Sequence, residues 1–541
     1  MWPAKNTQQY PSQEISTLES SLPNELYDFI FLYLKAIDII YSFFNLNGRF
    51  NNLIYPFLCA VDLSNVDERT LNKCCQTILP KIHHYIKAIK VDDKNIDSIF
   101  PLSLYSKIYP NLESVFITKV KIDGKYLSYL KLFKQLLNLK IYFDTEEINK
   151  TVSNELCLNL FQSACRLETL FFDQIYVPIN THFIQLCFSV RKLTIKVLYF
   201  HHIYILLNKL PSIESVNIAM PCVASHRQQQ LLLLEKYIEF NYNQNIPSTL
   251  SKLKHFVFYA VFNANYDYLE LLLSHCCPNV EYLSLKVYIN QFIDGERLEK
   301  MLLSKLTKLK VFHFCFRIPV VDSTLNIDDY IQTYKSSYWI DNNHSILCFN
   351  QPLHRRYCVF SLPFMFDKFC FVSNDLVNYR SNVNDDILLY SKQNKADMIS
   401  FSDDTVPYTF ELFQIIQKSF PRATELMFEA AHVRCLSDNI LHNELVMENI
   451  VTVTYMFKQL EFKYFRRLLL LTPNIQTLYI LESLVLDVLR KSEDSSFQQL
   501  QSACSRIRCV GIGKPSFEYD AVNDYSVKVL FPNAELFGEW R

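Results

Sequence analysis

A short apolar pattern recurs along most of this chain. In the segment PNLESVFI, residues 110–117, apolar side chains stand at Leu112, Val115 and Ile117 with other residues between them. Four more segments have the same spacing: PSIESVNI at 211–218, PNVEYLSL at 278–285, PRATELMF at 421–428 and PNIQTLYI at 473–480. Alternation of this kind predicts a short β-strand that buries one of its faces.

Weaker copies extend the pattern into a ladder with a nearly regular step. They begin at Ile86, Leu136, Leu167, Val190, Leu253, Leu309, Tyr357, Ala396, Ile450, Ile507 and Ala534. Successive starts lie 23 to 32 residues apart between residues 86 and 213, and again from residue 396 onward. Each step has room for one strand and one helix, and neither can bury its apolar side alone, so successive units must stack. We therefore predict an α/β fold, a solenoid over residues 86–541 with one curved parallel sheet and helices on its convex face.

Three intervals between predicted strands are longer than the rest. They are residues 213–253, 309–357 and 357–396. One interpretation is that they hold inserted loops that contact a ligand, because binding residues often lie on loops. The other is that they hold a longer helix or an unrecognised repeat. The spacing alone does not choose between the two.

Ahead of the ladder lies a segment of a different kind. Residues 21–34, SLPNELYDFIFLYL, are apolar most of the way round a helix. Pro23 suits the first turn of this helix, where its missing N–H removes no hydrogen bond. We expect a break after it, a second helix from Asp38 through Phe44, and a third short helix after Gly48.

Three short helices in so few residues cannot enclose a core of their own. Their apolar surplus must therefore be covered either by the first repeat, as an end cap, or by another protein. We expect residues 1–20 to be a flexible tail, residues 21–60 to form the three-helix domain, and residues 61–85 to form a helical linker or cap.

Charge and composition narrow the classes of partner. The chain has 54 Lys and Arg against 55 Asp and Glu, so it lacks the basic excess that nucleic-acid binding requires. Residues 1–20 do not have the layout of a secretory signal, and no apolar run reaches the length of a membrane span. We expect no nucleic-acid or membrane partner, a cytoplasmic or nuclear location, and 16 cysteines that are mostly buried thiols.

Signatures of catalysis are missing from the sequence. The stretch VGIGKPS at 510–516 lacks the four-residue spacer of a phosphate-binding loop, and Pro515 replaces its hydroxyl residue. The pairs His83-His84 and His201-His202 are adjacent instead of spaced as zinc ligands are. We expect no cofactor, no metal and no enzymatic activity.

Two parts of the chain resemble known families. The strand spacing is similar to that of the leucine-rich repeat in a degenerate form, since the usual Asn or Cys after the strand is not regular here. The N-terminal segment resembles the F-box. The residues that match are Leu22-Pro23, Glu25, Leu26, Ile30, Leu34, Asp38, Ile39, Leu46 and Arg49-Phe50. An F-box followed by leucine-rich repeats is the architecture of substrate-recognition subunits of SCF-type, or cullin-RING, ubiquitin ligases.

The F-box resemblance implies a set of docking residues. A Skp-type adaptor, which links to a cullin, would contact Leu22, Pro23, Leu26, Ile30, Leu34, Ile37 and Ile39. In this interpretation one stripe of the first helix meets the adaptor, and a second stripe with Phe29, Phe31 and Tyr33 meets the body of the protein.

The strand pattern indicates where a protein substrate would bind. The face opposite the buried one carries aromatic and charged residues, which suit a protein interface. These candidates are Phe116, Lys140, Phe171, Lys192, Lys196, His255, Tyr259, Tyr282, Lys286 and Tyr479. The alternative function is a repeat scaffold for protein–protein interaction without ligase partners, whose N-terminal helices act only as a cap. Because such a face is assembled from residues far apart in the chain, no linear motif identifies the substrate.

Overall fold

The computed structural model forms two compact units, residues 1–256 and 257–541. The residues that the structure describes are 22–100, 109–121, 129, 136–144, 150–177, 184–220, 247, 249–320, 326–351, 354–383, 393–401, 406–428, 436, 445–455, 462–481, 485, 488–489, 495–513 and 528–540. The predicted tail, residues 1–20, lies outside them.

The first unit begins with three short helices, as predicted. They are α2 (Asn24–Leu32), α3 (Ala36–Phe43) and α4 (Gly48–Ile54), followed by the 3₁₀ turn η1 (Tyr55–Leu58). The second helix starts two residues before Asp38, which lies in its first turn and does not cap it. Asn47 caps α4, because its side chain accepts a hydrogen bond from the backbone N–H of Phe50.

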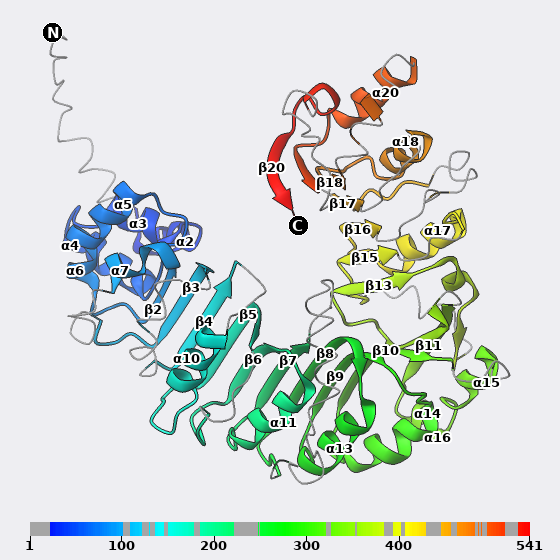
Figure 1. Ribbon diagram of the computed structural model, residues 1–541. Helices are drawn as coiled ribbons and strands as arrows, with labels where there is room; N and C mark the ends of the chain where they lie inside the picture. Colours follow the sequence, from blue (N-terminus) through cyan, green and yellow to red (C-terminus); the bar gives the residue numbers. More distant parts are fainter. Residues whose placement is uncertain are drawn as a thin grey trace. The chain divides into compact units, whose positions relative to one another are not determined.

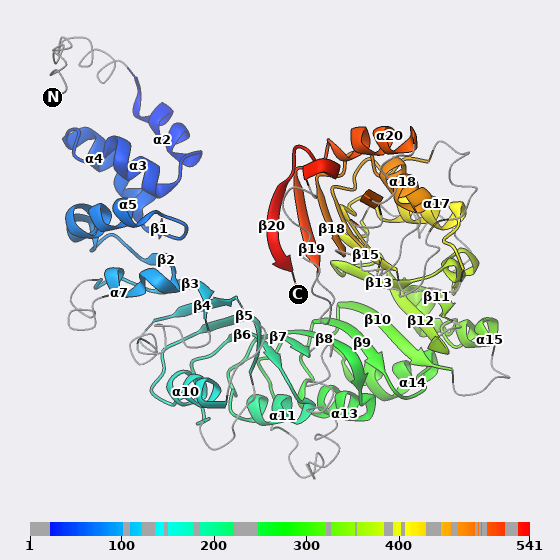
Figure 2. The ribbon, with the colours of Figure 1, turned by 45° about the horizontal axis from the view of Figure 1, so that its top comes forward.

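A parallel sheet follows the helices. Its strands in the first unit are β1 (Ala60–Asp62), β2 (Ala88–Asp92), β3 (Ser114–Val120), β4 (Asn138–Phe143), β5 (Thr169–Val177), β6 (Lys192–Val197) and β7 (Ser215–Met220), each parallel to the next. The intervening helices include α5 (Glu68–Lys73), η2 (Cys74–Ile78), α6 (Leu79–Ile82), η3 (Asp93–Asn95), α7 (Ile96–Ile99), α10 (Lys150–Leu160) and α11 (Phe200–Asn208). Helices α10 and α11 lie on the same side of these strands (Figures 1 and 2).

The apolar ladder predicted the strand positions closely. The predicted starts at Ile86, Leu112 and Leu136 each lie two residues before a strand, and the same offset holds through most of the chain. Within β3, Val115 and Ile117 are fully buried, as the alternation requires. The repeats begin earlier than expected, however. Strand β1 pairs with β2, although its last two residues fall in the segment expected to be a helical linker, and a strand of three residues is too short to show a pattern.

The second unit contains two sheets. In the first, β8 (His255–Ala264, which begins at the unit boundary), β9 (Tyr282–Ile289) and β10 (Val311–Pro319) are followed in space by β12 (Arg356–Leu362), β11 (Ser345–Gln351) and β14 (Arg380–Ser381). The second comprises β13 (Lys368–Val372), β15 (Met398–Phe401), β16 (Glu425–Phe428), β17 (Thr452–Tyr455), β18 (Thr477–Leu481), β19 (Cys509–Gly513) and β20 (Glu535–Trp540), all parallel.

Helices cover one side of each sheet of the second unit. They include α13 (Tyr266–Cys276), α14 (Gly295–Arg297), η6 (Leu298–Leu302), η7 (Leu303–Lys305), α15 (Ile327–Gln332), α16 (Ser337–Asp341), η9 (Asn374–Asn378), α17 (Phe410–Ser419), α18 (Phe462–Leu471) and α20 (Ser495–Cys504). Figure 2 shows α17, α18 and α20 along one side of the second sheet. No helix among the described residues is long and apolar enough to cross a bilayer.

The expectation of one uninterrupted parallel sheet is wrong in the second unit. Strand β12 is antiparallel to both β10 and β11, and β14 is antiparallel to β11. The cause is the short connection between β11 and β12, residues 352–355, since a parallel neighbour needs a crossover of a dozen residues or more. Of the long intervals, 309–357 holds the additional strand β11 with α15 (Ile327–Gln332) and α16 (Ser337–Asp341), and 357–396 holds the change of sheet between β12 and β13. In the third interval, residues 221–246 lie outside the described residues.

An asparagine ladder links neighbouring repeats at the turn before the strand. Asn449, Asn474 and Asn533 each donate a side-chain hydrogen bond of 2.8 to 2.9 Å to a backbone carbonyl of the preceding repeat. Asn111 does the same in the first unit, at 2.7 Å. The regular polar position is thus before the strand, whereas the family pattern directs attention to the residue after it.

Candidate functional site

Helix α2 is anchored by two aromatic side chains one turn apart. Tyr27 packs edge-on against Phe50 of α4, with ring centroids 4.9 Å apart. Phe31 does the same with Phe43 of α3 at 5.0 Å and with Phe57 of η1 at 5.4 Å. The spacing of four residues places both anchors on the same face of the helix. That face is the inner side of α2.

The rest of α2 presents apolar side chains outward. Fifteen large hydrophobic side chains are exposed in the described part of the chain, and eight of them fall between residues 26 and 46. The eight are Leu26, Phe29, Ile30, Leu32, Tyr33, Leu34, Tyr41 and Leu46. Leu32 and Tyr33 are 70% and 84% exposed, and such a concentration of exposed apolar side chains is typical of a protein–protein contact. We call these eight residues the apolar surface.

The structure sorts the expected docking residues into two groups. Pro23, Leu26, Ile30 and Leu34 are exposed, and Leu22 and Ile37 are half-buried. Ile39 is different. It is 1% exposed, because α3 packs against β1 and turns this side chain into the core. Ile39 is therefore a core residue, and its assignment to the docking set is wrong.

The second predicted stripe of α2 is also only partly correct. Phe31 points inward as expected, but Phe29 and Tyr33 do not. The reason is helical spacing. Phe31 shares the inner face with Tyr27, whereas Phe29 and Tyr33 lie two residues from Phe31 on either side and so face away from the core. The apolar surface is consequently wider than the sequence indicated.

Arg49 fixes the start of α2. Its Nε donates to Asn24 Oδ1 at 2.9 Å, and its Nη2 donates to the backbone carbonyl of Leu22 at 2.5 Å. Its guanidinium carbon also lies 5.7 Å from the ring centroid of Tyr27. Sequence reasoning used Arg49 only as a landmark beside Phe50. In the structure it adds polar contacts to the packing of Tyr27 on Phe50 that joins α2 to α4.

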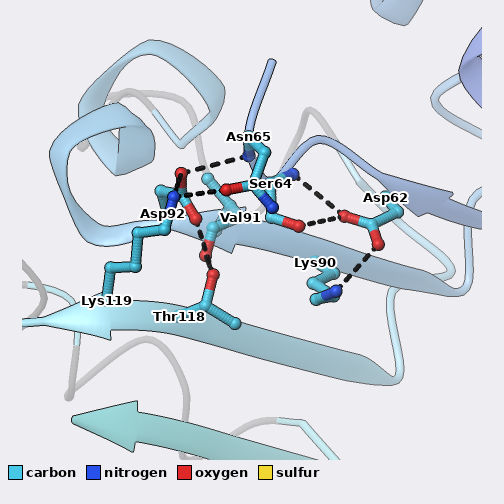
Figure 3. Close-up of polar contacts among 8 residues, drawn as sticks. All are labelled: Asp62, Ser64, Asn65, Lys90, Val91, Asp92, Thr118 and Lys119. Carbon is cyan, nitrogen blue, oxygen red and sulfur yellow. Dashed lines mark hydrogen bonds and ion pairs between the residues drawn. The ribbon is translucent and has the colours of Figure 1, made fainter. Parts of the chain in front are cut away.

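A polar cluster ties the first three strands together at their carboxyl ends (Figure 3). Asp92, the last residue of β2, is 1% exposed. Its carboxylate accepts hydrogen bonds from Thr118 Oγ1 at 2.6 Å and from the backbone N–H of Asn65 at 3.1 Å, and Lys119 Nζ lies 3.3 Å away. Asn65 and Lys119 both have positive φ, and Lys119 lies where the register of β3 and β4 shifts.

This arrangement keeps Asp92 ionised. Burial alone would raise the pKa of its carboxyl group, but the hydrogen bonds from Thr118 and Asn65 and the charge of Lys119 together hold that pKa below its ordinary value. A carboxylate with a low pKa and filled hydrogen-bonding positions is poorly suited to proton transfer at neutral pH. Its role is structural: it secures the loop after β1, and β1 is the strand on which α3 packs.

Three of the candidate substrate residues in the first unit share one face of the sheet. Phe116, Lys140 and Phe171 are in register on β3, β4 and β5. Lys140 Nζ lies 5.1 Å from the ring centroid of Phe116 and 5.8 Å from that of Phe171. Lys196 lies 3.8 Å from a carboxylate oxygen of Asp173. These residues form a half-buried row of aromatic and cationic groups.

The remaining candidates are more scattered. Lys192 and His255 are exposed, and Tyr282 and Tyr479 are half-buried on different sheets. Tyr259 and Lys286 lie together, with Lys286 Nζ 4.9 Å from the centroid of the Tyr259 ring. Lys286 also donates to the backbone carbonyl of Lys368 on β13. No group of three or more His, Cys, Asp or Glu side chains that could hold a metal occurs within the described ranges.

Comparison with known proteins adds little. No protein-family model matches the sequence, and no curated protein matches it. A chain from the crystal structure of the Rad7 and Elc1 complex in yeast is similar at 11% sequence identity with a TM-score of 0.24, over 97% of this chain and 95% of that chain. A likeness at this level establishes neither a shared fold nor a shared function.

Proposed function

We propose that this chain is the substrate-recognition subunit of a cullin-RING ubiquitin ligase. In this proposal α2, α3 and α4 form an F-box that docks on a Skp-type adaptor, and the adaptor links the chain to a cullin. The repeats bind a protein substrate. The observation that carries the proposal is the apolar surface, eight exposed hydrophobic side chains within 21 residues of sequence.

A docking role accounts for α2 better than a capping role does. A cap explains α3, whose Ile39 and Ile40 are buried and which packs against β1. It leaves Phe29, Leu32 and Tyr33 exposed to water, although burying one such side chain is worth about 1.5–3 kcal/mol. A partner that covers these side chains would recover that free energy.

The internal packing of the three helices also suits docking. The inner face of α2 is held by Tyr27, Phe31 and the hydrogen bonds of Arg49. The helix is therefore ordered before a partner arrives, and the partner does not have to supply the free energy of ordering it. An apolar surface on a fixed helix is the arrangement expected of a hydrophobic docking handle.

In this function the chain carries out no bond chemistry. It holds a lysine of the substrate near a ubiquitin-charged enzyme, and the rate rises because the two reactants share one complex at high effective concentration. The candidate substrate face is the row that contains Phe116, Lys140 and Phe171, together with the corresponding residues on later strands.

The second candidate is a repeat scaffold without ligase partners. The packing of α3 on β1 favours it, because that contact closes the exposed end of the first repeat as a cap does. In that case the apolar surface would bind some other protein or a second copy of the chain.

Co-purification separates the two candidates. The full chain is expressed with and without a Skp-type adaptor of its own organism and analysed by size-exclusion chromatography with light scattering. The ligase proposal predicts a stable complex of one chain and one adaptor. An adaptor that elutes separately at micromolar concentrations of both proteins contradicts it.

A further inference from the structure

A groove of about 960 Å³ runs along the edge of the second sheet where its strands begin. It is lined from residues 421–424, 448–451, 473–476, 505–508 and 533, the turns before β16, β17, β18, β19 and β20. Because these strands are parallel neighbours, the five turns follow one another along one edge of the sheet (Figure 2). We call it the edge groove. Four strand spacings span about 19 Å, the length of about six residues of extended peptide.

Two arginines occupy the position that asparagine takes in the other repeats of this edge. Asn449, Asn474 and Asn533 each stand directly before a buried apolar residue of the turn. Arg422 and Arg506 stand in the same place in the repeats that begin with β16 and β19. The asparagine ladder is therefore interrupted by a cation before each of these two strands.

The hydrogen bonds of the ladder leave the edge groove rich in donors. Arg506 makes the same bond as the asparagines, because its Nη1 donates to the backbone carbonyl of Pro473 at 3.1 Å. The carbonyls of Pro421, Glu448 and Ser505 are occupied in the same way by the asparagines. Among the described residues, Nε and Nη2 of Arg506 make no hydrogen bond. Such a groove favours a ligand that brings hydrogen-bond acceptors.

The charge of the edge groove is positive. Four charged residues line it, Arg422, Glu448, Arg506 and Arg508, so three positive charges stand against one negative charge. All four are exposed. Within the described ranges, no carboxylate lies within 4.0 Å of the three guanidinium groups. The positive charge is therefore available to a ligand.

We propose that the edge groove binds an acidic segment of a partner protein in an extended conformation. Arg422 lies before β16, and Arg506 and Arg508 lie before β19, three strand spacings or about 14 Å along the edge. Four residues of an extended peptide cover nearly the same distance, and side chains four apart point to the same side. The ligand is thus a segment with two carboxylates four residues apart, each bound by guanidinium groups.

A nucleic acid matches the edge groove less well. A single strand carries a phosphate at every nucleotide and is bound by cations along its whole length. The described lining residues before β17 and β18 include no cation, and Glu448 there would repel a phosphate. The groove belongs to the second unit and the apolar surface to the first, so this proposal does not depend on the proposed function.

Isothermal titration calorimetry on the full chain at low ionic strength tests the proposal with three capped peptides. The probe is acetyl-Ser-Glu-Ser-Val-Ser-Glu-Ser-amide, whose glutamates are four residues apart. The second peptide has glutamine in place of both glutamates, and the third has its two glutamates adjacent. We expect the probe to bind with a Kd of about 1 mM or tighter, the adjacent form about threefold more weakly or worse, and the glutamine form not at all.

Arg506→Asn is the sharpest variant, because it restores the asparagine of the ladder. It keeps a donor for the carbonyl of Pro473 and removes only the charge, so it should fold as the wild type does. We expect it to weaken binding of the probe about threefold or more. Lys300→Gln is the matched control. It removes an exposed lysine of the same unit that does not line the groove, and it should bind as the wild type does.

Glu448→Gln should act in the opposite direction. It removes the negative charge of the edge groove, so we expect the probe to bind about twofold more tightly or better. An unchanged or weaker affinity for this variant contradicts the proposed charge match.

Three further results overturn the proposal. One is equal binding of the glutamine peptide or of the peptide with adjacent glutamates. Another is an Arg506→Asn variant that binds the probe no more weakly than Lys300→Gln does. The third is a single-stranded oligodeoxythymidine of six nucleotides that binds more tightly than the probe, which would favour a nucleic acid. None of these results bears on adaptor binding, so the proposed function is tested separately.

Discussion

Arg49 donates a hydrogen bond of 2.9 Å from Nε to the side-chain oxygen of Asn24, and this contact joins α4 to the first turn of α2. A second bond, from Nη2 to the carbonyl of Leu22, holds the residue that precedes the helix. The guanidinium thus binds both a side chain and the backbone at one helix end. This polar anchor adds to the packing of Tyr27 and Phe31, which also orients the exposed side chains of α2.

Replacing Arg49 is expected to loosen α2 without unfolding the chain. Arg49→Met should speed amide hydrogen exchange across 24–32 and leave the exchange of β3 to β7 unchanged, because two hydrogen bonds are lost at one end of one helix. The local free energy of opening should fall by about 1–3 kcal/mol. Arg69→Met, an exposed arginine of α5, is the control. Unchanged exchange in α2 of Arg49→Met would show that packing alone holds the helix.

Asp92 predicts a pH dependence of stability. The folded state holds the pKa of this carboxyl group below its ordinary value of about 3.9, so ionised Asp92 stabilises the fold at pH values above that. The stabilisation is lost as the pH falls through the folded-state pKa, when the carboxylate takes up a proton. At pH 7 we expect Asp92→Asn to lower the free energy of unfolding by about 1.5–3 kcal/mol.

Urea denaturation at several pH values checks this. The difference between wild type and Asp92→Asn should be constant from pH 7 to pH 5 and should shrink below pH 4. Asp62→Asn is the matched control, because Asp62 also has a lowered pKa but is half exposed in its ion pair with Lys90, and surface pairs contribute about 0–1 kcal/mol. A difference for Asp92→Asn that grows toward acid pH would have the wrong sign for this account.

The asparagine ladder predicts that removing one of its side-chain hydrogen bonds lowers the free energy of unfolding. Asn474 donates a hydrogen bond of 2.9 Å to the carbonyl of Glu448 in the preceding repeat. Asn474→Ala and Asn474→Asp should each lower the free energy of unfolding of the second unit by about 0.5–1.5 kcal/mol, because both remove the donor. The aspartate variant keeps the shape of the side chain. If it is as stable as the wild type, the amide donor is not the source of the stabilisation.

Much of the repeat fold could be predicted from the sequence because the physics is local and periodic. A buried strand face requires an apolar residue at every second position, and stacking requires the same face in every unit. The repeated pattern of buried residues such as Val115, Val453 and Leu478 is therefore enough to locate the strands. Strand β1 was not predicted, because only Val61 of its three residues is buried. The antiparallel direction of β12 was not predicted, because the alternation of apolar residues does not indicate strand direction.

The candidate sites were less predictable for a related reason. Helical spacing indicated that α2 has more apolar side chains than one buried face needs, but only packing shows that Phe31 is buried while Phe29 is exposed. The edge groove is lined by residues of five turns. Little in the local sequence distinguishes Arg422 and Arg506 from the other arginines of the chain. Their sequence signal is weak: each stands directly before an apolar residue, where other repeats have asparagine.

The central claim is that the apolar surface binds a Skp-type adaptor, and the affinity of Ile30→Asp for the adaptor tests it most directly. Ile30 is 43% exposed, and Leu470→Asp, at a residue 49% exposed on α18, is the matched control. We predict that Ile30→Asp weakens adaptor binding by about 2 kcal/mol or more while its melting temperature stays within about 2 °C of the wild type, and that Leu470→Asp changes neither. Unchanged adaptor affinity for Ile30→Asp, or a broad loss of thermal stability instead, would contradict the docking role and favour the cap.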